Sequence, residues 1–202
     1  MNNKCVFLDK DGTLIVDVPY NTNTELIVLY DDIIEPLKQL QTNGYKFIII
    51  SNQAGLAKEL FTEDQLHKAF GFIISELRNK GIEILDYAYC PHDTDKFHQA
   101  VCSCRKPNAK LFLDMAIKHR INLDQSWMVG DILSDVIAGN KAGCRTILID
   151  RLRTEIVKTS SLSTYENPTF YCKDFAQVDK LIINYKNNED GTRYLKSIRE
   201  IQ

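Results

Sequence analysis

The segment Cys5-Val6-Phe7-Leu8-Asp9-Lys10-Asp11-Gly12-Thr13 decides the fold of this chain. Four consecutive apolar residues are typical of a strand that is covered on both faces, as in a parallel sheet. The polar residues that follow emerge at the carboxyl end of that strand, where ligands bind in open α/β sheets. Of Asp9 and Asp11, one can act as a nucleophile and the other as a proton carrier. A solvated turn also uses Asp and Gly, but the full five-residue pattern after a strand favours a catalytic site.

Further apolar runs of the same kind follow along the chain, at residues 47–50, 127–129 and 146–149, with a weaker one at 84–89. Segments with helical periodicity lie between them. Thr62 and Gln65, for example, have the spacing of a capping box, which predicts a helix that ends at Gly81. Other helices are expected before Gly44, from near Asn108 and just after Asp131, with a surface loop over 154–168 and a last strand and helix over 169–185. This alternation predicts an α/β fold, a three-layer sandwich with a mostly parallel, Rossmann-like sheet.

The chain has 202 residues and a formal net charge of -2, from 25 basic and 27 acidic side chains. This length favours one domain, which we expect over residues 1–185, followed by a polar tail over 186–202. The near-neutral charge argues against nucleic acid as a partner, and no run approaches the roughly 20 apolar residues that a membrane span needs. The first residues form no apolar signal segment, so we expect a cytoplasmic protein whose six cysteines are no disulfide framework.

Two further motifs contain groups that suit a phosphate. Ser51-Asn52-Gln53 follows the second apolar run, where a hydroxyl and backbone amides can hold a phosphate oxygen, although such a strand end is more often only a turn. Arg105-Lys106-Pro107 places a lysine beside a proline, which suits a point charge that steadies a transferring phosphoryl group. A basic pair alone is usually solvated surface. We therefore take Ser51, Asn52, Gln53 and Arg105 as candidate substrate contacts and Lys106 as a candidate catalytic residue.

Asp131 and Asp135 suggest a metal site. Asp131 emerges at the end of the run at 127–129, and Asp135 lies four residues on, hence on the same face of the helix expected to begin there. Together with Asp9 they offer the oxygen ligands that Mg²⁺ prefers. Aspartates at this place can also cap a helix and complement its dipole, and this can be partly true of Asp135.

A second group of metal ligands lies in the segment over residues 90–104. Cys90 and His92 form a C-x-H pair, and Cys102 and Cys104 form a C-x-C pair after nine intervening residues. Three thiolates and an imidazole suit a closed tetrahedral zinc site, which is structural because it leaves no position open. The alternatives are free thiols or a labile disulfide, and His98 is a rival ligand. Because Arg105 and Lys106 follow directly, we expect this zinc-binding loop to set the position of the lysine.

In this order, the four strand-end motifs resemble those of the haloacid dehalogenase superfamily of phosphatases, over about residues 4–150. The resemblance implies that Asp9 attacks phosphorus and forms an aspartyl phosphate, while Asp11 protonates the leaving oxygen and then activates the hydrolytic water. It implies Mg²⁺ bound by Asp9, the Asp11 backbone carbonyl and Asp131, with Asp135 in support. The residues that it assigns to phosphate binding are Thr13, Ser51 and Lys106.

The zinc-binding loop before Arg-Lys-Pro narrows the resemblance to the group that contains D,D-heptose 1,7-bisphosphate phosphatases and histidinol-phosphate phosphatases. Members generally lack a large cap domain, which implies a capless fold and a monomer here. The run Asn52-Gln53-Ala54-Gly55-Leu56-Ala57 resembles the substrate loop of the heptose branch. The leading hypothesis is therefore removal of the C7 phosphate of D-glycero-D-manno-heptose 1,7-bisphosphate, a small sugar bisphosphate.

Two departures keep an alternative substrate open. Ile132 stands where the group commonly has a basic residue, and Asn108-Ala109-Lys110-Leu111 replaces the Pro-Gly-Met turn of the heptose branch and looks more like the histidinol-phosphate branch. The partners for the amine and imidazole of histidinol phosphate would be Asp17, Tyr20 and Glu25. A third hypothesis is a non-catalytic, zinc-stabilised binding module.

Overall fold

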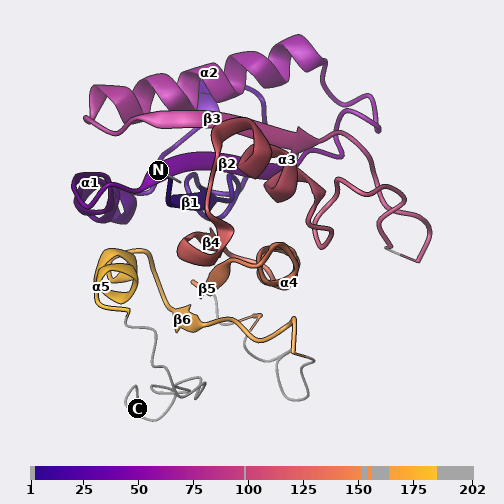
Figure 1. The fold of residues 1–202 in the computed structure, drawn as a ribbon. Coiled ribbons are helices and arrows are strands. Elements are labelled where there is room, and N and C mark those ends of the chain that lie inside the picture. The colour runs from indigo at the N-terminus through magenta and orange to yellow at the C-terminus, as the bar shows by residue number, and fades with distance from the viewer. Residues whose placement is uncertain (1–2, 98, 152–153, 156–163, 186–202) are drawn as a thin grey trace.

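The structure is a computed structural model that describes residues 3–97, 99–151, 154–155 and 164–185 (Figure 1). Its centre is a six-stranded sheet in the order β3-β2-β1-β4-β5-β6, in which all neighbouring strands are parallel. The strands are β1 (Cys5–Leu8), β2 (Lys46–Asn52), β3 (Ile84–Cys90), β4 (Trp127–Gly130), β5 (Arg145–Ile149) and β6 (Phe170–Cys172). Each predicted apolar run therefore forms a strand.

Helices cover both faces of the sheet, as Figure 1 shows. One face packs against α1 (Ile34–Thr42), α2 (Glu63–Asn79) and α5 (Val178–Ile183), and the other against α3 (Lys110–His119) and α4 (Leu133–Ala142). Three short 3₁₀ helices, Thr24–Leu26, Asp31–Ile33 and Leu123–Gln125, lie in the connections. The predicted three-layer sandwich with a parallel, Rossmann-like sheet is confirmed.

The strand β1 shows why the runs are continuously apolar. Successive side chains of a strand point to opposite faces. Val6 and Leu8 enter the core with α1, α2 and α5, whereas Cys5 and Phe7 enter the core with α3 and α4. All four side chains are fully buried. An alternating pattern would leave polar groups inside one of these two cores.

The helix α2 begins as the sequence predicts. Thr62 Oγ1 accepts the N–H of Gln65 at 3.3 Å, and Gln65 Oε1 accepts the N–H of Thr62 at 2.8 Å. The helix ends at Asn79, and Gly81 adopts a φ of 84°, a left-handed conformation that suits glycine. The start of α2 is thus fixed by local chemistry that can be read from the sequence.

The connection expected over 154–168 is not all surface. The side chain of Glu155 is buried, because it reaches back to the start of α4, so the prediction of a surface loop is wrong at this residue. Residues 156–163 of this connection lie outside the described part of the chain, as do His98 and the tail over 186–202. Within the described ranges, the helices are too short or too polar to cross a membrane.

Candidate active site

Three of the predicted site segments meet at the carboxyl end of the sheet. Asp9 follows β1, Ser51 lies near the end of β2, and Asp131 follows β4. The strand β1 pairs with β2 on one side and with β4 on the other. In a sheet of this strand order the ligand binds where the order reverses, which is between β1 and β4. These side chains therefore lie where such a sheet presents its ligand site.

Lys106 is the centre of the site. Its Nζ lies 2.5 Å from Asp9 Oδ1, 2.6 Å from Asp135 Oδ1 and 2.9 Å from the carbonyl oxygen of Ile50. Burial lowers the pKa of a lysine, but the attraction of the two carboxylates outweighs it and raises the pKa of Lys106 above its usual value. The lysine is therefore a fixed positive charge between two acids.

Asp9, Asp131 and Asp135 fit a divalent cation. One carboxylate oxygen from each of them lies within 4.8 Å of the other two. Burial raises the pKa of Asp9 to about 7 and that of Asp131 to about 9, and repulsion among the acids adds to the effect while Lys106 opposes it. Three acids share one lysine, so a divalent cation would neutralise the excess negative charge. Carboxylates are the ligands that Mg²⁺ prefers, so these residues suit the predicted magnesium site.

The relation between Asp131 and Asp135 differs from the prediction. The helix α4 begins at Leu133, so Asp131 precedes it and the two aspartates do not share a helical face. Asp135 lies in the first turn, where its Oδ2 accepts the N–H of Ile132 at 3.3 Å. The capping interpretation is therefore correct for Asp135, whose other oxygen faces Lys106.

Asp11 is held by two donors. Lys10 Nζ lies 2.7 Å from one of its oxygens, and Gln53 Nε2 lies 3.1 Å from the other. Gln53 Nε2 also donates to Ser51 Oγ at 2.7 Å. Lys10 has no predicted role, because a lysine in a turn is usually solvated. Here it is 1% exposed, and its Nζ lies 6.0 Å from the centre of the Phe70 ring.

Two glycines allow the aspartates to approach the backbone. A Cβ on Gly12, whose φ is 75°, would lie 2.1 Å from Asp131 Oδ2. A Cβ on Gly130 would lie 2.3 Å from Asp135 Oδ2. Thr13 Oγ1 also donates to Asp131 Oδ1, at a long 3.4 Å. Any side chain at either glycine would collide with a carboxylate of the candidate magnesium site.

Asn52 holds the lysine segment in place. Its Oδ1 accepts the N–H of Lys106 at 3.0 Å, and its Nδ2 donates to the carbonyl oxygen of Lys106 at 3.1 Å. The pair joins the end of β2 to a residue far along the chain. Asn52 was predicted as a substrate contact; it lines the cleft, but its amide is occupied by this backbone.

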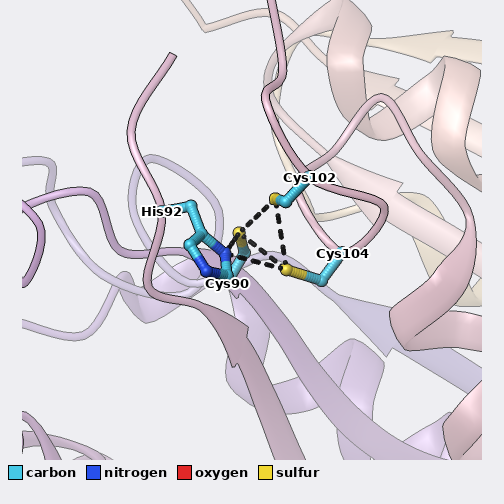
Figure 2. A group of neighbouring side chains, drawn as sticks. All are labelled: Cys90, His92, Cys102 and Cys104. Carbon is cyan, nitrogen blue, oxygen red and sulfur yellow. Dashed lines mark hydrogen bonds between the residues drawn. The ribbon is translucent and has the colours of Figure 1, made fainter.

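The four predicted zinc ligands come together, as Figure 2 shows. The sulfur atoms of Cys90, Cys102 and Cys104 lie 3.1–3.4 Å apart, and His92 Nδ1 lies 3.3 Å from Cys104 Sγ and 3.6 Å from Cys90 Sγ. Bonds of about 2.3 Å to a tetrahedral zinc place such atoms about 3.5–3.8 Å apart, so the cluster is close to the size of that site. Burial acts to raise the pKa of Cys102, but hydrogen bonds to the thiolate, chiefly from Cys104, lower it to about 7. The set fits zinc.

A cleft of about 870 Å³ lies beside Lys106. Asp11, Gln53 and Lys106 line it, together with part of the zinc-binding loop. Arg105 lines the cleft, and its Nη1 donates to the carbonyl oxygen of His92 at 2.9 Å, so the loop fixes its side chain. The other lining residues are Lys10, Asp17, Pro19, Tyr20, Asn21, Asn52, Ala54, Gly55, Lys58, Asp93, Thr94, Asp95, Lys96, Pro107, Ile132 and Ser134. Glu25, one of the proposed partners for an amine, does not line it.

Glu155 is a residue that the sequence analysis missed. Its Oε2 accepts the N–H of Leu133 at 3.1 Å, at the start of α4 and next to the metal-site aspartates. Its own N–H donates to Asp150 Oδ2 at 3.1 Å. The contact spans 22 residues along the chain, and no local pattern announces it.

Comparisons with known proteins identify the family of this chain. The family profile described as HAD-hydrolase-like matches residues 103–178. The D-glycero-beta-D-manno-heptose-1,7-bisphosphate 7-phosphatase of Pasteurella multocida is 31% identical over 91% of this chain and 99% of its own length. The protein of the same name from Haemophilus ducreyi is 37% identical over 75% of this chain and 85% of its own. The histidine biosynthesis bifunctional protein HisB of Campylobacter jejuni is 32% identical over 84% of this chain but only 48% of its own length.

A solved structure shares the fold. The D,D-heptose 1,7-bisphosphate phosphatase from B. bronchiseptica, complexed with magnesium and phosphate, superposes with a TM-score of 0.77 at 24% identity, over 89% of this chain and 98% of its own. The named relatives, rather than the shared fold, argue against the hypothesis of a non-catalytic binding module. The chain belongs to the haloacid dehalogenase superfamily of phosphatases, in its heptose-1,7-bisphosphate 7-phosphatase group, and is a phosphoric monoester hydrolase.

Proposed function

We propose that this chain removes the C7 phosphate of D-glycero-D-manno-heptose 1,7-bisphosphate through a phospho-aspartyl intermediate on Asp9. The main support for this reaction is the buried contact between Asp9 Oδ1 and Lys106 Nζ at 2.5 Å. It lies at the ligand-binding end of the sheet, beside Asp131 and Asp135. The names of the relatives from Pasteurella multocida and Haemophilus ducreyi support the substrate.

Asp9 supplies the nucleophile. A carboxylate oxygen attacks the phosphorus of the C7 phosphate, the bond from phosphorus to the C7 oxygen breaks, and Asp9 carries the phosphoryl group. Asp11, held by Lys10 and Gln53, donates its proton to the departing oxygen. It then takes a proton from the water that attacks the aspartyl phosphate, which releases inorganic phosphate and restores Asp9.

The surrounding groups screen the charge. Lys106 neutralises part of the negative charge that the phosphoryl oxygens and Asp9 bring together. Ser51 Oγ accepts a hydrogen bond from Gln53, so its own hydrogen is available to the phosphate. Thr13 Oγ1 would exchange its long contact with Asp131 Oδ1 for a phosphate oxygen. Mg²⁺, held by Asp9, the Asp11 backbone carbonyl and Asp131 with Asp135 in support, would supply the positive charge that lets an anionic nucleophile approach an anionic phosphate.

Zinc at Cys90, His92, Cys102 and Cys104 would be structural. All four ligands come from the protein, which leaves no position for a substrate. The chain leads from Cys104 directly to Arg105 and Lys106, so the ion would hold the wall of the cleft and the start of the lysine segment. A monomeric, cytoplasmic enzyme without a nucleic-acid partner stays our prediction from the sequence.

Histidinol phosphate is the second candidate substrate. Asp17 and Tyr20 line the cleft, and an acid and an aromatic ring suit an amine and an imidazole. The similarity to the HisB protein of Campylobacter jejuni also favours it.

A substrate panel separates the two candidates. Magnesium-dependent phosphate release would be measured on both heptose 1,7-bisphosphate anomers, histidinol phosphate and common sugar phosphates. We expect the highest kcat/KM on a heptose bisphosphate. A preference for histidinol phosphate would overturn the proposed substrate but would still support a phosphatase.

A further inference from the structure

The cleft contains more positive charge than the chemistry at Asp9 uses. Among the described residues that line it, five are cationic: Lys10, Lys58, Lys96, Arg105 and Lys106. Lys106 Nζ already has three partners, and Lys10 is buried against Asp11. The contacts around Asp9 and Asp11 therefore do not involve the other three cations, Lys58, Lys96 and Arg105.

Lys58 lies in a segment that its own backbone holds in shape. This segment follows β2, and the N–H of Lys58 donates to the carbonyl oxygen of Ala54 at 3.1 Å. The N–H of Leu60 donates to the carbonyl oxygen of Gly55 at 2.9 Å, and the ring of Phe61 packs so closely on Gly55 that a Cβ there would lie 2.1 Å from it. The base of the Lys58 side chain is thus positioned before any ligand arrives.

The partner of Lys58 is Asp93, which belongs to the zinc-binding loop. Lys58 Nζ and Asp93 Oδ2 form an ion pair in the cleft, and the two side chains are 38% and 33% exposed. Arg105 lies close by, since its Nη1 donates to the carbonyl oxygen of His92, the residue before Asp93, at 2.9 Å. Two cations from different segments therefore lie near one carboxylate.

We propose that Lys58 binds the phosphate that is not transferred, by exchanging Asp93 for a phosphate oxygen, with Arg105 as its partner. This inference rests on the proposed function, since it assigns a residue to the second phosphate of a sugar bisphosphate.

Two physical arguments and one structural observation favour this exchange of Asp93 for a phosphate oxygen. An exposed ion pair contributes little stability, so Lys58 loses little when it leaves Asp93. A phosphate carries more negative charge than one carboxylate and can accept from an ammonium and a guanidinium at once. On the side of the cleft next to Asp131 stands Ile132, an apolar residue that is 42% exposed and offers the phosphate no charge.

The test compares two substrates that share the reacting phosphate, heptose 1,7-bisphosphate and heptose 7-phosphate. The readout is the ratio of their kcat/KM values. Replacing Lys58 by methionine should lower this ratio about 10- to 100-fold, the usual effect of losing a charge-assisted hydrogen bond, mainly through KM for the bisphosphate. Lys58→Arg should keep most of the ratio. Lys68→Met, at an exposed position on α2 outside the cleft, is the matched control.

Asp93→Asn separates ligand binding from a purely structural ion pair. If Lys58 binds phosphate, removal of its competitor should leave the ratio unchanged or raise it. If the ion pair only joins two loops, Asp93→Asn should lower kcat/KM as much as Lys58→Met does, and to the same extent for both substrates. This result would overturn the inference.

The outcomes also separate this inference from the proposed function. A wild-type preference for the heptose bisphosphate that survives Lys58→Met overturns the inference alone. A preference for a different bisphosphate that Lys58→Met abolishes supports the inference and overturns the heptose assignment. A wild-type enzyme without preference for any bisphosphate over its monophosphate overturns both.

Discussion

Replacing Cys104 by serine tests whether the zinc-binding loop positions the catalytic lysine. Cys104 Sγ contacts Cys90 Sγ, Cys102 Sγ and His92 Nδ1, so this change removes a ligand that contacts the other three. Serine is nearly the same size but does not supply a thiolate, so the variant should bind zinc much more weakly. Lys106 stands two residues further along the chain.

The size of the effect follows from the loop that the ion closes. The ligands join Cys90 to Cys104, and by the chain-entropy relation a closed loop of about 15 residues stabilises the fold by about 3 kcal/mol. For a chain of this length that corresponds to a fall in Tm of about 6–12 °C if the loop opens together with the sheet. If the loop opens by itself, the loss appears instead as faster amide exchange there.

The assay combines zinc content, thermal unfolding and amide hydrogen exchange over residues 91–97 and 99–107. Cys172→Ser, a thiol on β6 outside the cluster, is the matched control and should keep both its zinc and the slow exchange of the loop. A Cys104→Ser variant that lost zinc but kept its Tm, its loop protection and its turnover would refute the structural role of the ion.

Three further predictions concern the charges. Lys106→Met should lower kcat by at least about 100-fold in steady-state assays, because it removes the cation that screens Asp9; a loss below tenfold would contradict this role. Mg²⁺ affinity should rise as the pH rises from about 6 to about 8, because the raised pKa values of Asp9 and Asp131 mean that binding must release protons; calorimetry in two buffers of different ionisation enthalpy measures the release, and a zero value would contradict it. Asp32→Asn should cost about 1–3 kcal/mol in urea unfolding, because Asp32 accepts from Arg151 at 2.8 and 3.0 Å. Burial raises the pKa of Asp32, but these hydrogen bonds outweigh it and lower the pKa, so the difference should be present at neutral pH and vanish as the pH falls below about 4; a pH-independent difference would contradict this.

The fold could be predicted because its signals are local. Continuous apolar runs such as 47–50 form strands that are buried on both faces, and the Thr62–Gln65 capping box marks a helix start. The convergence of Asp9 and Asp131 follows from the parallel topology, since all strands of such a sheet end at one edge. The zinc cluster likewise follows from ligand spacing.

The parts that could not be predicted depend on contacts between distant segments. Lys10 looks like a solvated turn residue until Phe70 and Asp11 enclose it. Glu155 reaches the start of α4 from a connection that reads as a polar loop. The pairing of Lys58 with Asp93 exists only because the zinc-binding loop folds over the segment after β2. The distant partners, Phe70 for Lys10, Leu133 for Glu155 and Asp93 for Lys58, are not revealed by the sequence next to these residues.

The central claim is that Asp9 carries the phosphoryl group, and trapping that intermediate tests it most directly. The wild-type enzyme would be mixed with Mg²⁺ and heptose 1,7-bisphosphate, quenched in acid within one turnover, and digested for mass spectrometry. Asp9→Asn and, as the matched control, Asp64→Asn at an exposed position on α2 would be treated alike. We expect one phosphoryl group on the peptide that contains Asp9 in the wild type and in Asp64→Asn, and neither that adduct nor phosphate release in Asp9→Asn. Phosphate release by Asp9→Asn at the wild-type rate, or a phosphoryl group trapped on another residue, would contradict the account.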